Sequence, residues 1–179
     1  AQADLIREAI LRKLRDNSEM GDVVGDVKCY FAMRYWNPYT EEVLEQIQED
    51  GIDSLVIVPL YPQYSISTSG SSLKLLQEIF SKYPDAWGSD KIMHTVVASW
   101  YHRPGYITAM AALVVKEVLA YSPAEMREGV HVLFSAHGVP QSYIASGDPY
   151  KDQIEECVKL ISREVATLLK LEQASDRLG

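Results

Sequence analysis

The sequence predicts an α/β fold in which a parallel sheet is flanked by helices on both faces. Five stretches with a helical pattern alternate along the chain with four stretches that have a strand-like pattern. One strand-like stretch, residues 54–60, is a nearly continuous apolar run, which is typical of a strand buried on both faces. Strands of this kind that alternate with helices indicate crossover connections and hence a parallel sheet.

The first two elements are predicted from the spacing of apolar residues. A helix is expected over residues 4–15, because apolar side chains recur there at helical spacing. The first strand is expected over residues 27–33.

The second helix is predicted from its end signals. Asn37 is a good capping residue, and Pro38 suits the first helical position because its missing N–H costs nothing there. Gly51 is expected to end the helix in the left-handed conformation. Its apolar stripe consists of Val43, Leu44 and Ile47.

The remaining elements follow in the same way. After the strand at 54–60 and a polar loop at 61–70, we expect a helix at 71–83, a strand at 91–99, a helix at 104–121, a strand at 130–136 and a last helix that starts at Asp148-Pro149. Ser122 and Glu125 have the spacing of a capping box, which predicts a short helix there. For the helix at 104–121 we expect the core residues Met110, Leu113, Val114 and Leu119. For the last helix we expect the stripe Ile154, Cys157, Val158, Ile161, Val165 and Leu168.

Composition limits the class of protein. The chain has 179 residues, enough for one domain with a core, and 47% of them are apolar. The net charge is −8 and no block of Lys or Arg stands out, which argues against binding to nucleic acid or to an anionic membrane surface. There is no apolar run long enough to span a membrane and no signal-peptide pattern. The start at Ala1 suggests a fragment or a processed product.

The two cysteines, Cys29 and Cys157, are expected to be free thiols in a reducing compartment. An iron–sulfur cluster needs about four thiolates, so this chain alone is not expected to hold one.

Candidate site residues follow from the rule that ligands of open α/β sheets bind beyond the carboxyl ends of the strands. These ends carry one Arg, one His and many aromatic and hydroxyl side chains, which suits a flat, mostly apolar ligand with acidic groups. The segments concerned are 33–36, 61–72, 99–101 and 135–138.

Each candidate also has a purely structural interpretation. His137 could be an ordinary hydrogen-bonded histidine, Arg34 could pair with a surface carboxylate, and about half of the aromatic residues are expected to be packing residues. The Ser/Thr loop is similar to a phosphate cradle but lacks the glycine and lysine signature of one. Residue spacing alone therefore predicts a ligand-binding α/β domain without naming the ligand.

Four sequence blocks resemble the ferrochelatase family, in family order and with family spacing. They are residues 60–72 (LYPQYSISTSGSS), residues 134–140 (FSAHGVP) with 147–150 (GDPY) and Gln153, residues 33–35 (MRY) with Pro38 and Glu41, and residues 99–101 (SWY). The wording of these blocks is nearest to plant, algal and cyanobacterial members. The resemblance covers nearly the whole chain.

This resemblance implies a Rossmann-like, chelatase-like parallel sheet flanked by helices, as one half of a two-half fold. Residues 1–134 are then most of the first domain, and residues 135–179 hold the His loop and a long helix that leads into a second domain. The implied activity is insertion of Fe²⁺, as a substrate, into protoporphyrin IX to form haem. The family pattern makes His137 the catalytic and metal-site residue and places Arg34, Tyr35, Tyr64, Ser67 and Ser71 at the substrate.

The family also extends before and beyond this chain. Its second half carries a Glu that faces the His across the cleft, so we expect the chain alone to expose apolar surface, to be marginally stable or to associate, and to be inactive. The alternatives are a non-catalytic porphyrin-binding module, a chelatase for another metal or tetrapyrrole and, least favoured, a nucleotide-binding fold. A chloroplast or a bacterial cytoplasm fits, and peripheral membrane association and a homodimer stay open.

Overall fold

The computed structural model describes residues 2–17, 24–122, 124–125 and 129–175. They fall into two compact units. Unit 1 contains the described residues up to Ser54 and those from Glu78 to Met93, and unit 2 contains those from Leu55 to Gln77 and from His94 onward.

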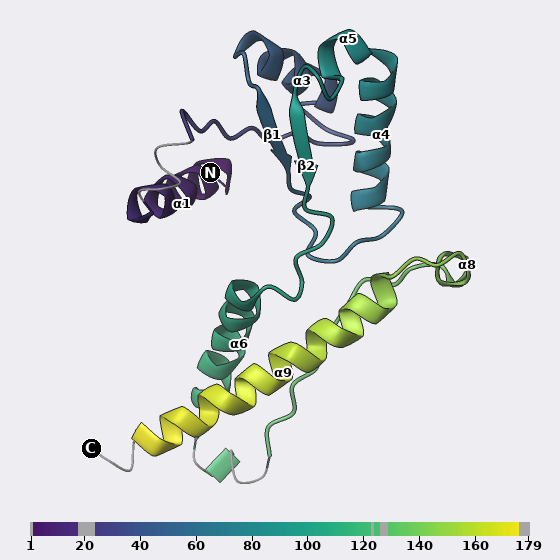
Figure 1. The fold of residues 1–179 in the computed structure, drawn as a ribbon. Helices are drawn as coiled ribbons and strands as arrows, with labels where there is room; N and C mark the ends of the chain where they lie inside the picture. The colour runs from purple at the N-terminus through teal and green to yellow at the C-terminus, as the bar shows by residue number, and fades with distance from the viewer. Residues whose placement is uncertain (1, 18–23, 123, 126–128, 176–179) are drawn as a thin grey trace. The chain divides into compact units, whose positions relative to one another are not determined.

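The predicted α/β class is confirmed by a parallel strand pair with a helical crossover (Figure 1). Strand β1 (Ser54–Ile57) lies beside β2 (Met93–Val96). The Met93 amide donates to the carbonyl of Asp53 at 2.9 Å, and the Val97 amide donates to that of Ile57 at 2.9 Å. Helix α4 (Ser69–Lys82) and the short α5 (Pro84–Trp87) connect the two strands, as parallel strands require a crossover connection.

Unit 1 has a small apolar core around helix α3 (Thr40–Glu49). The expected stripe is confirmed, since Val43, Leu44 and Ile47 are buried. Trp87 is also buried, and its ring stacks on Phe80 with centroids 4.9 Å apart. Helix α1 (Gln2–Asp16), predicted over residues 4–15, is present but buries none of its residues.

Helix α3 starts later than Asn37-Pro38 predicts. The carbonyl of Pro38 accepts from the Met33 amide at 2.9 Å, so it does not begin the helical ladder. The first helical bond runs instead from the Val43 amide to the Tyr39 carbonyl, and the Glu42 carboxylate accepts from the Tyr39 amide at 3.0 Å. The other end is as predicted, because Gly51 has a φ of 66°.

Two of the four predicted strands are not strands in the described part of the chain. Residues 27–33 form only an isolated bridge, from Met33 to Tyr39, and residues 130–136 have no regular structure. An apolar run predicts burial, whereas a strand exists only when a neighbour supplies hydrogen bonds along its length. No described residue supplies them to either run.

Unit 2 is held together by α6 (Pro104–Leu119) and α9 (Tyr150–Ser175), which pack on each other. Ile107 of α6 contacts the buried Cys157 and Ile161 of α9, so the stripe predicted for the last helix is confirmed. The face predicted for α6 is only partly confirmed. Met110 packs against the core and Val114 is half-buried, but Leu113 and Leu119 are exposed. The fully buried positions are Ile107, Ala111, Val115 and Val118. Helix α6 is apolar almost all round, so periodicity could not select its inner face.

Two smaller expectations are also tested. The capping box is confirmed, since the Ser122 amide donates to Glu125 Oε2 at 2.8 Å and the Glu125 amide donates to Ser122 Oγ at 3.3 Å. Both cysteines are free, as predicted.

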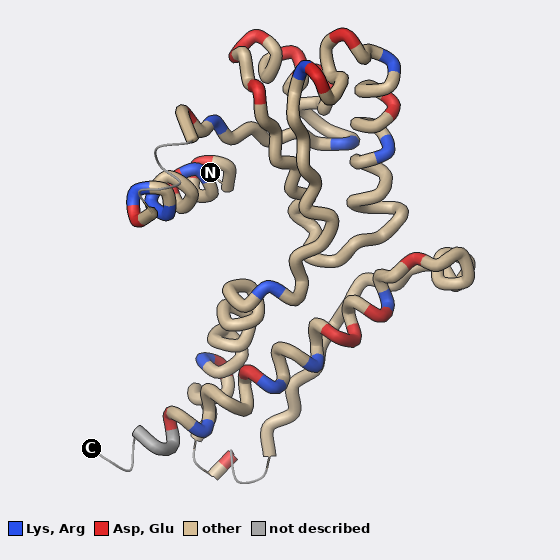
Figure 2. Tube along the Cα trace, viewed as in Figure 1, with Lys and Arg blue, Asp and Glu red and all other residues tan. Residues whose placement is uncertain are grey.

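Acidic and basic side chains are mixed along α9 (Figure 2). None of the described helices combines the length and apolar character that crossing a bilayer requires.

Candidate substrate-binding site

The loop between β1 and α4 is folded around Ser65, which is 1% exposed. The Ser65 carbonyl accepts from the amides of Thr68 at 3.2 Å and Gly70 at 2.9 Å. Its hydroxyl lies 2.8 Å from Asp148 Oδ2 and 3.2 Å from Ser67 Oγ. A buried hydroxyl with two side-chain partners gives this turn a defined shape.

The start of α9 supplies the acceptors that hold this loop. Asp148 Oδ2 accepts from the Ile66 amide at 2.9 Å, and Asp148 Oδ1 accepts from the Tyr150 amide at 3.0 Å. One turn further along, Gln153 Oε1 accepts from the Tyr64 amide at 2.8 Å. Two side chains near one helix end therefore satisfy two loop amides that lie more than 80 residues away in the sequence.

The Asp148 carboxyl is 4% exposed. Burial alone would raise its pKa, but the amides of Ile66 and Tyr150 and the Ser65 hydroxyl donate to the ionised form. These donors outweigh burial and hold the pKa of the Asp148 carboxyl below its ordinary value. It is therefore a charged acceptor at neutral pH, with hydrogen-bond donors on both oxygens.

The start of α4 packs tightly against the same loop. A Cβ at Gly70 would lie 2.7 Å from the Tyr64 hydroxyl oxygen and 3.1 Å from the Ser65 carbonyl oxygen, so only glycine fits without a shift. Ser69 is buried, and its Oγ has no hydrogen-bond partner among the described residues. Ser71 is half-buried and Ser67 is exposed.

The carboxyl end of β2 meets the same region. The amides of Trp100 and Tyr101 both donate to the Pro62 carbonyl, at 2.8 and 3.0 Å. The Trp100 indole donates to the Pro59 carbonyl at 2.8 Å. The Tyr101 hydroxyl donates to Glu156 at 2.6 Å, and this bond raises the pKa of Tyr101 to about 12. The structure thus brings together two of the four expected strand ends.

His137 lies in unit 2, in the irregular segment that precedes α8 (Gln141–Ala145). Its side chain is exposed, and no hydrogen bond or ion pair joins it to another described residue. An exposed imidazole is open to an incoming ligand. The described residues also contain no cluster of three or more His, Cys, Asp or Glu that could hold a metal ion.

Arg34 and Tyr35 lie in unit 1, whereas the other four expected site residues lie in unit 2. The Arg34 guanidinium carbon is 4.9 Å from the centroid of the exposed Tyr35 ring, a cation–π distance. Arg34 Nε is buried and has no hydrogen-bond partner among the described residues.

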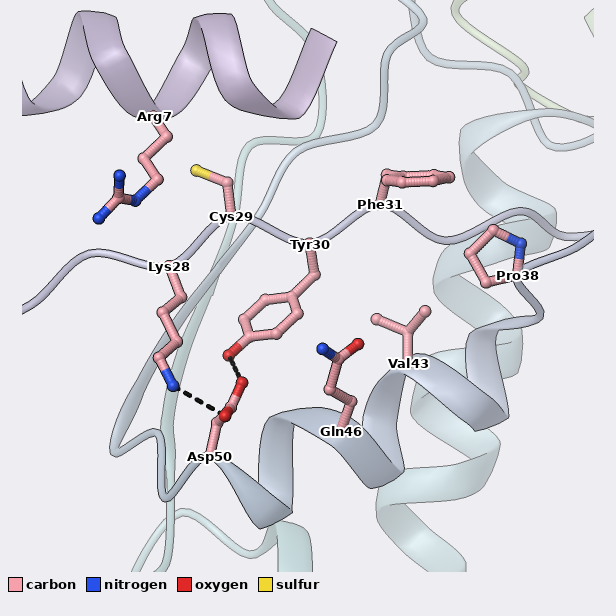
Figure 3. A pocket seen from close by; sticks show the side chains of 9 residues that line it. All are labelled: Arg7, Lys28, Cys29, Tyr30, Phe31, Pro38, Val43, Gln46 and Asp50. Atoms are coloured by element: carbon pink, nitrogen blue, oxygen red, sulfur yellow. Dashed lines mark hydrogen bonds and ion pairs between the residues drawn. The ribbon is translucent and has the colours of Figure 1, made fainter. Parts of the chain in front are cut away.

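A separate open cavity of about 400 Å³ lies in unit 1 between α1 and α3 (Figure 3). In Figure 3, Tyr30 and Lys28 both point to Asp50, at 2.6 and 2.7 Å. Burial and the bond to Asp50 raise the pKa of the Tyr30 phenol, and the bonds from Lys28 and Tyr30 lower that of the Asp50 carboxyl. None of the expected site residues lines this cavity, which no sequence pattern predicted.

Sequence reasoning missed the part that Ser65, Asp148 and Gln153 play in shaping the site. The sequence assigns Asp148 to a helix start and to a family block but gives it no role at the site, and it does cap α9 through its bond to the Tyr150 amide. Its second oxygen reaches a loop that no local pattern connects with it.

The fold and the site define a Rossmann-like α/β domain in which a hydroxyl-rich loop and an exposed histidine follow apolar runs. The ferrochelatase family model matches residues 5–175. The chain is 49% identical over 166 residues to ferrochelatase-2, chloroplastic, of Oryza sativa subsp. indica, an alignment that covers 92% of this chain and 28% of the rice protein. It is also 49% identical over 145 residues to the ferrochelatase of Nostoc punctiforme, with 80% of this chain and 36% of that protein covered.

The chain therefore belongs to the ferrochelatase family, as the sequence blocks predicted. It spans about a third of the length of these relatives. The similarity to plant chloroplast and cyanobacterial proteins confirms the relationship that the wording of the blocks indicated.

Proposed function

We propose that this chain is part of a ferrochelatase, which inserts Fe²⁺ into protoporphyrin IX to form haem. The observation that carries the proposal is the family match over residues 5–175. Ferrous iron and the porphyrin are both substrates, and two protons leave the porphyrin for each ion that enters. The enzyme is a metal-chelating lyase of haem biosynthesis.

His137 is assigned the catalytic and metal-site role. Metal insertion removes two pyrrole protons, and a neutral imidazole can accept a proton or bind Fe²⁺. The exposure of His137 supports this role, because the nitrogen lone pair must be reachable by the substrate. Both roles need an accessible imidazole nitrogen, so the experiment below tests His137 in either of them.

The porphyrin is assigned to Arg34, Tyr35, Tyr64, Ser67 and Ser71. Arg34 is suited to a carboxylate because its guanidinium offers donors in a fixed plane, and its Nε has no partner among the described residues. Tyr35 exposes an aromatic face that suits a flat ring. Ser67, in the loop that carries Tyr64, and Ser71, in the first turn of α4, add hydroxyl groups.

The surroundings of the enzyme are also a proposal. A plastid or a bacterial cytoplasm fits relatives whose names place them in chloroplasts or that come from cyanobacteria. Association with a membrane face would bring the enzyme to an apolar porphyrin. Assembly as a homodimer is a further part of the proposal. Residues 1–134 and 135–179 are proposed to belong to the first domain and to the start of the second.

A second candidate is a porphyrin-binding module that does not catalyse insertion. It is favoured by one observation, namely that the chain covers 28% of the rice relative and 36% of the Nostoc relative. In this candidate function, the residues assigned to the porphyrin still bind it, but the chain does not catalyse metal insertion.

The test is to mix the chain with a soluble porphyrin and either Zn²⁺ or anaerobic Fe²⁺, and to follow porphyrin absorbance and fluorescence. We expect porphyrin binding, and any metal insertion should be lost in His137→Ala. His131→Ala is the matched control, because His131 is an exposed histidine in the same segment. Binding without insertion by the unsubstituted chain agrees with both candidates, because the chain spans about a third of the length of its relatives, whereas insertion that His137→Ala abolishes would contradict the second candidate. Insertion that survives His137→Ala would remove His137 from the chemistry.

A further inference from the structure

The buried carboxylate of Asp148 does more than cap a helix. One bond, from the Tyr150 amide to Oδ1, is sufficient for the cap. Oδ2 instead accepts from the Ser65 hydroxyl at 2.8 Å and from the Ile66 amide at 2.9 Å. A buried carboxylate needs such donors, and here two of its three come from the loop that precedes α4.

The polarity of the hydrogen bonds is fixed by the charge on Asp148. An ionised carboxylate only accepts, so the Ser65 hydroxyl must donate its single proton to Oδ2. At the 3.2 Å contact between the two hydroxyls, Ser67 is then the donor and Ser65 the acceptor. Because Ser67 is exposed and its proton is used in this bond, its oxygen can accept a hydrogen bond from a ligand donor.

We propose that Asp148 is a positioning residue for tetrapyrrole binding, which acts through Ser65 and Ile66 to fix the orientation of the Ser67 hydroxyl. The inference rests on the proposed function for the identity of the ligand. The hydrogen bonds of Ser65 and Ile66 to Asp148, on which the inference is built, lie within unit 2 and do not depend on the proposed function.

Asp148→Asn separates this role from simple packing, because Asn has nearly the same shape as Asp. One end of its amide still accepts, but the other end is a donor. If the oxygen stays with Tyr150, the amide nitrogen faces the Ile66 N–H, and the two donors repel. Ser65→Ala removes one of the two loop donors, the hydroxyl, and leaves the Ile66 bond and the α9 cap intact.

The experiment measures two quantities on the chain and on each variant. Hydrogen exchange of backbone amides reports the loop itself, and titration with deuteroporphyrin followed by fluorescence reports ligand affinity. The control is Asp152→Asn, an exposed acid in the first turn of α9. The double variant Ser65→Ala/Asp148→Asn tests whether the two residues act together.

In Asp148→Asn, we expect exchange at Ile66 to be about tenfold faster, while the amide of Ile161 in the α6–α9 core is unchanged. The porphyrin Kd should rise about tenfold in Asp148→Asn and in the double variant alike, and about fivefold in Ser65→Ala. Asp152→Asn should match the unsubstituted chain. A larger loss in the double variant, equal to the product of the single losses, would overturn the inference.

Two further outcomes separate this inference from the proposed function. An unsubstituted chain that binds no porphyrin contradicts the proposed function, and the inference fails with it. Binding that neither Asp148→Asn nor Ser65→Ala weakens contradicts the inference alone. If Asp148→Asn does not fold by circular dichroism, Ser65→Ala decides, since a wild-type Kd in that variant overturns the inference.

Discussion

Two segments of unit 2 carry family blocks, and they differ in how they are held. Several amides and the Ser65 hydroxyl of the loop at residues 61–70 are bonded within the loop or to the start of α9. The segment at residues 130–138 contains His137, but among the described residues no hydrogen bond holds it, and its Leu133 is 93% exposed. The comparison teaches that hydrogen bonds within the described residues, several of them to the start of α9, fix the geometry of one family block, whereas the described residues supply no such bonds to the other.

The largest expected effect is on stability, and it distinguishes the packed helix α9 from the segment at residues 130–138, called the open segment below. Ile161→Ala should lower the free energy of unfolding by about 2 to 4 kcal/mol, because Ile161 is buried in the α6–α9 core. Leu133→Ala should change it by less than about 0.5 kcal/mol, because Leu133 buries almost nothing. Urea denaturation followed by circular dichroism gives both values. A comparable loss in Leu133→Ala would mean that residues 130–138 pack against something in the folded chain.

A smaller effect tests how tightly the loop at residues 61–70 is packed. Gly70→Ala should lower the free energy of unfolding by about 1 kcal/mol, because the new methyl group would meet the Tyr64 hydroxyl and the Ser65 carbonyl. Gly105→Ala is the matched control, since Gly105 is also the second residue of its helix and its Cβ would meet nothing within 4 Å. That variant should gain up to about 1 kcal/mol through helix propensity.

The same measurement on Gly138→Ala extends the test to the open segment. A Cβ at Gly138 meets nothing within 4 Å, so we expect a change near zero. Equal values for Gly70→Ala and Gly138→Ala would remove the contrast between the two segments.

The sequence predicted elements well at most local signals, although the start at Asn37-Pro38 failed because the Pro38 carbonyl bonds the Met33 amide. Pro104 starts α6 as predicted, and the Ser122–Glu125 capping box forms both of its bonds. Gly51 takes the left-handed conformation that a helix end requires. Each of these features depends on a few consecutive residues, so a sequence pattern is sufficient.

Prediction failed where the outcome depends on a distant partner. Residues 27–33 and 130–136 have the composition of strands, but pairing is decided by a neighbour that the pattern cannot name. For the same reason the sequence identified the candidates Ser67 and His137 but not the contact of Ser65 with Asp148, 83 residues away. The sequence showed which types of side chain follow the apolar runs, but it did not show which distant residues bond to them.

The smallest expected effect is a pH dependence that belongs to one segment only. The pKa of the Asp148 carboxyl is lowered in the folded chain, so its contribution is fully present above the unfolded pKa of about 4 and is lost as pH falls through the folded pKa. Between pH 5 and pH 3, protection of the Ile66 amide against hydrogen exchange, corrected for the intrinsic rate, should therefore fall. Residues 129–140 contain no Asp or Glu, so their protection should stay flat over the same range. Asp148→Asn should remove the pH dependence at Ile66, whereas Asp152→Asn should retain it. A dependence that persists without the Asp148 carboxylate would show that another acid holds the loop.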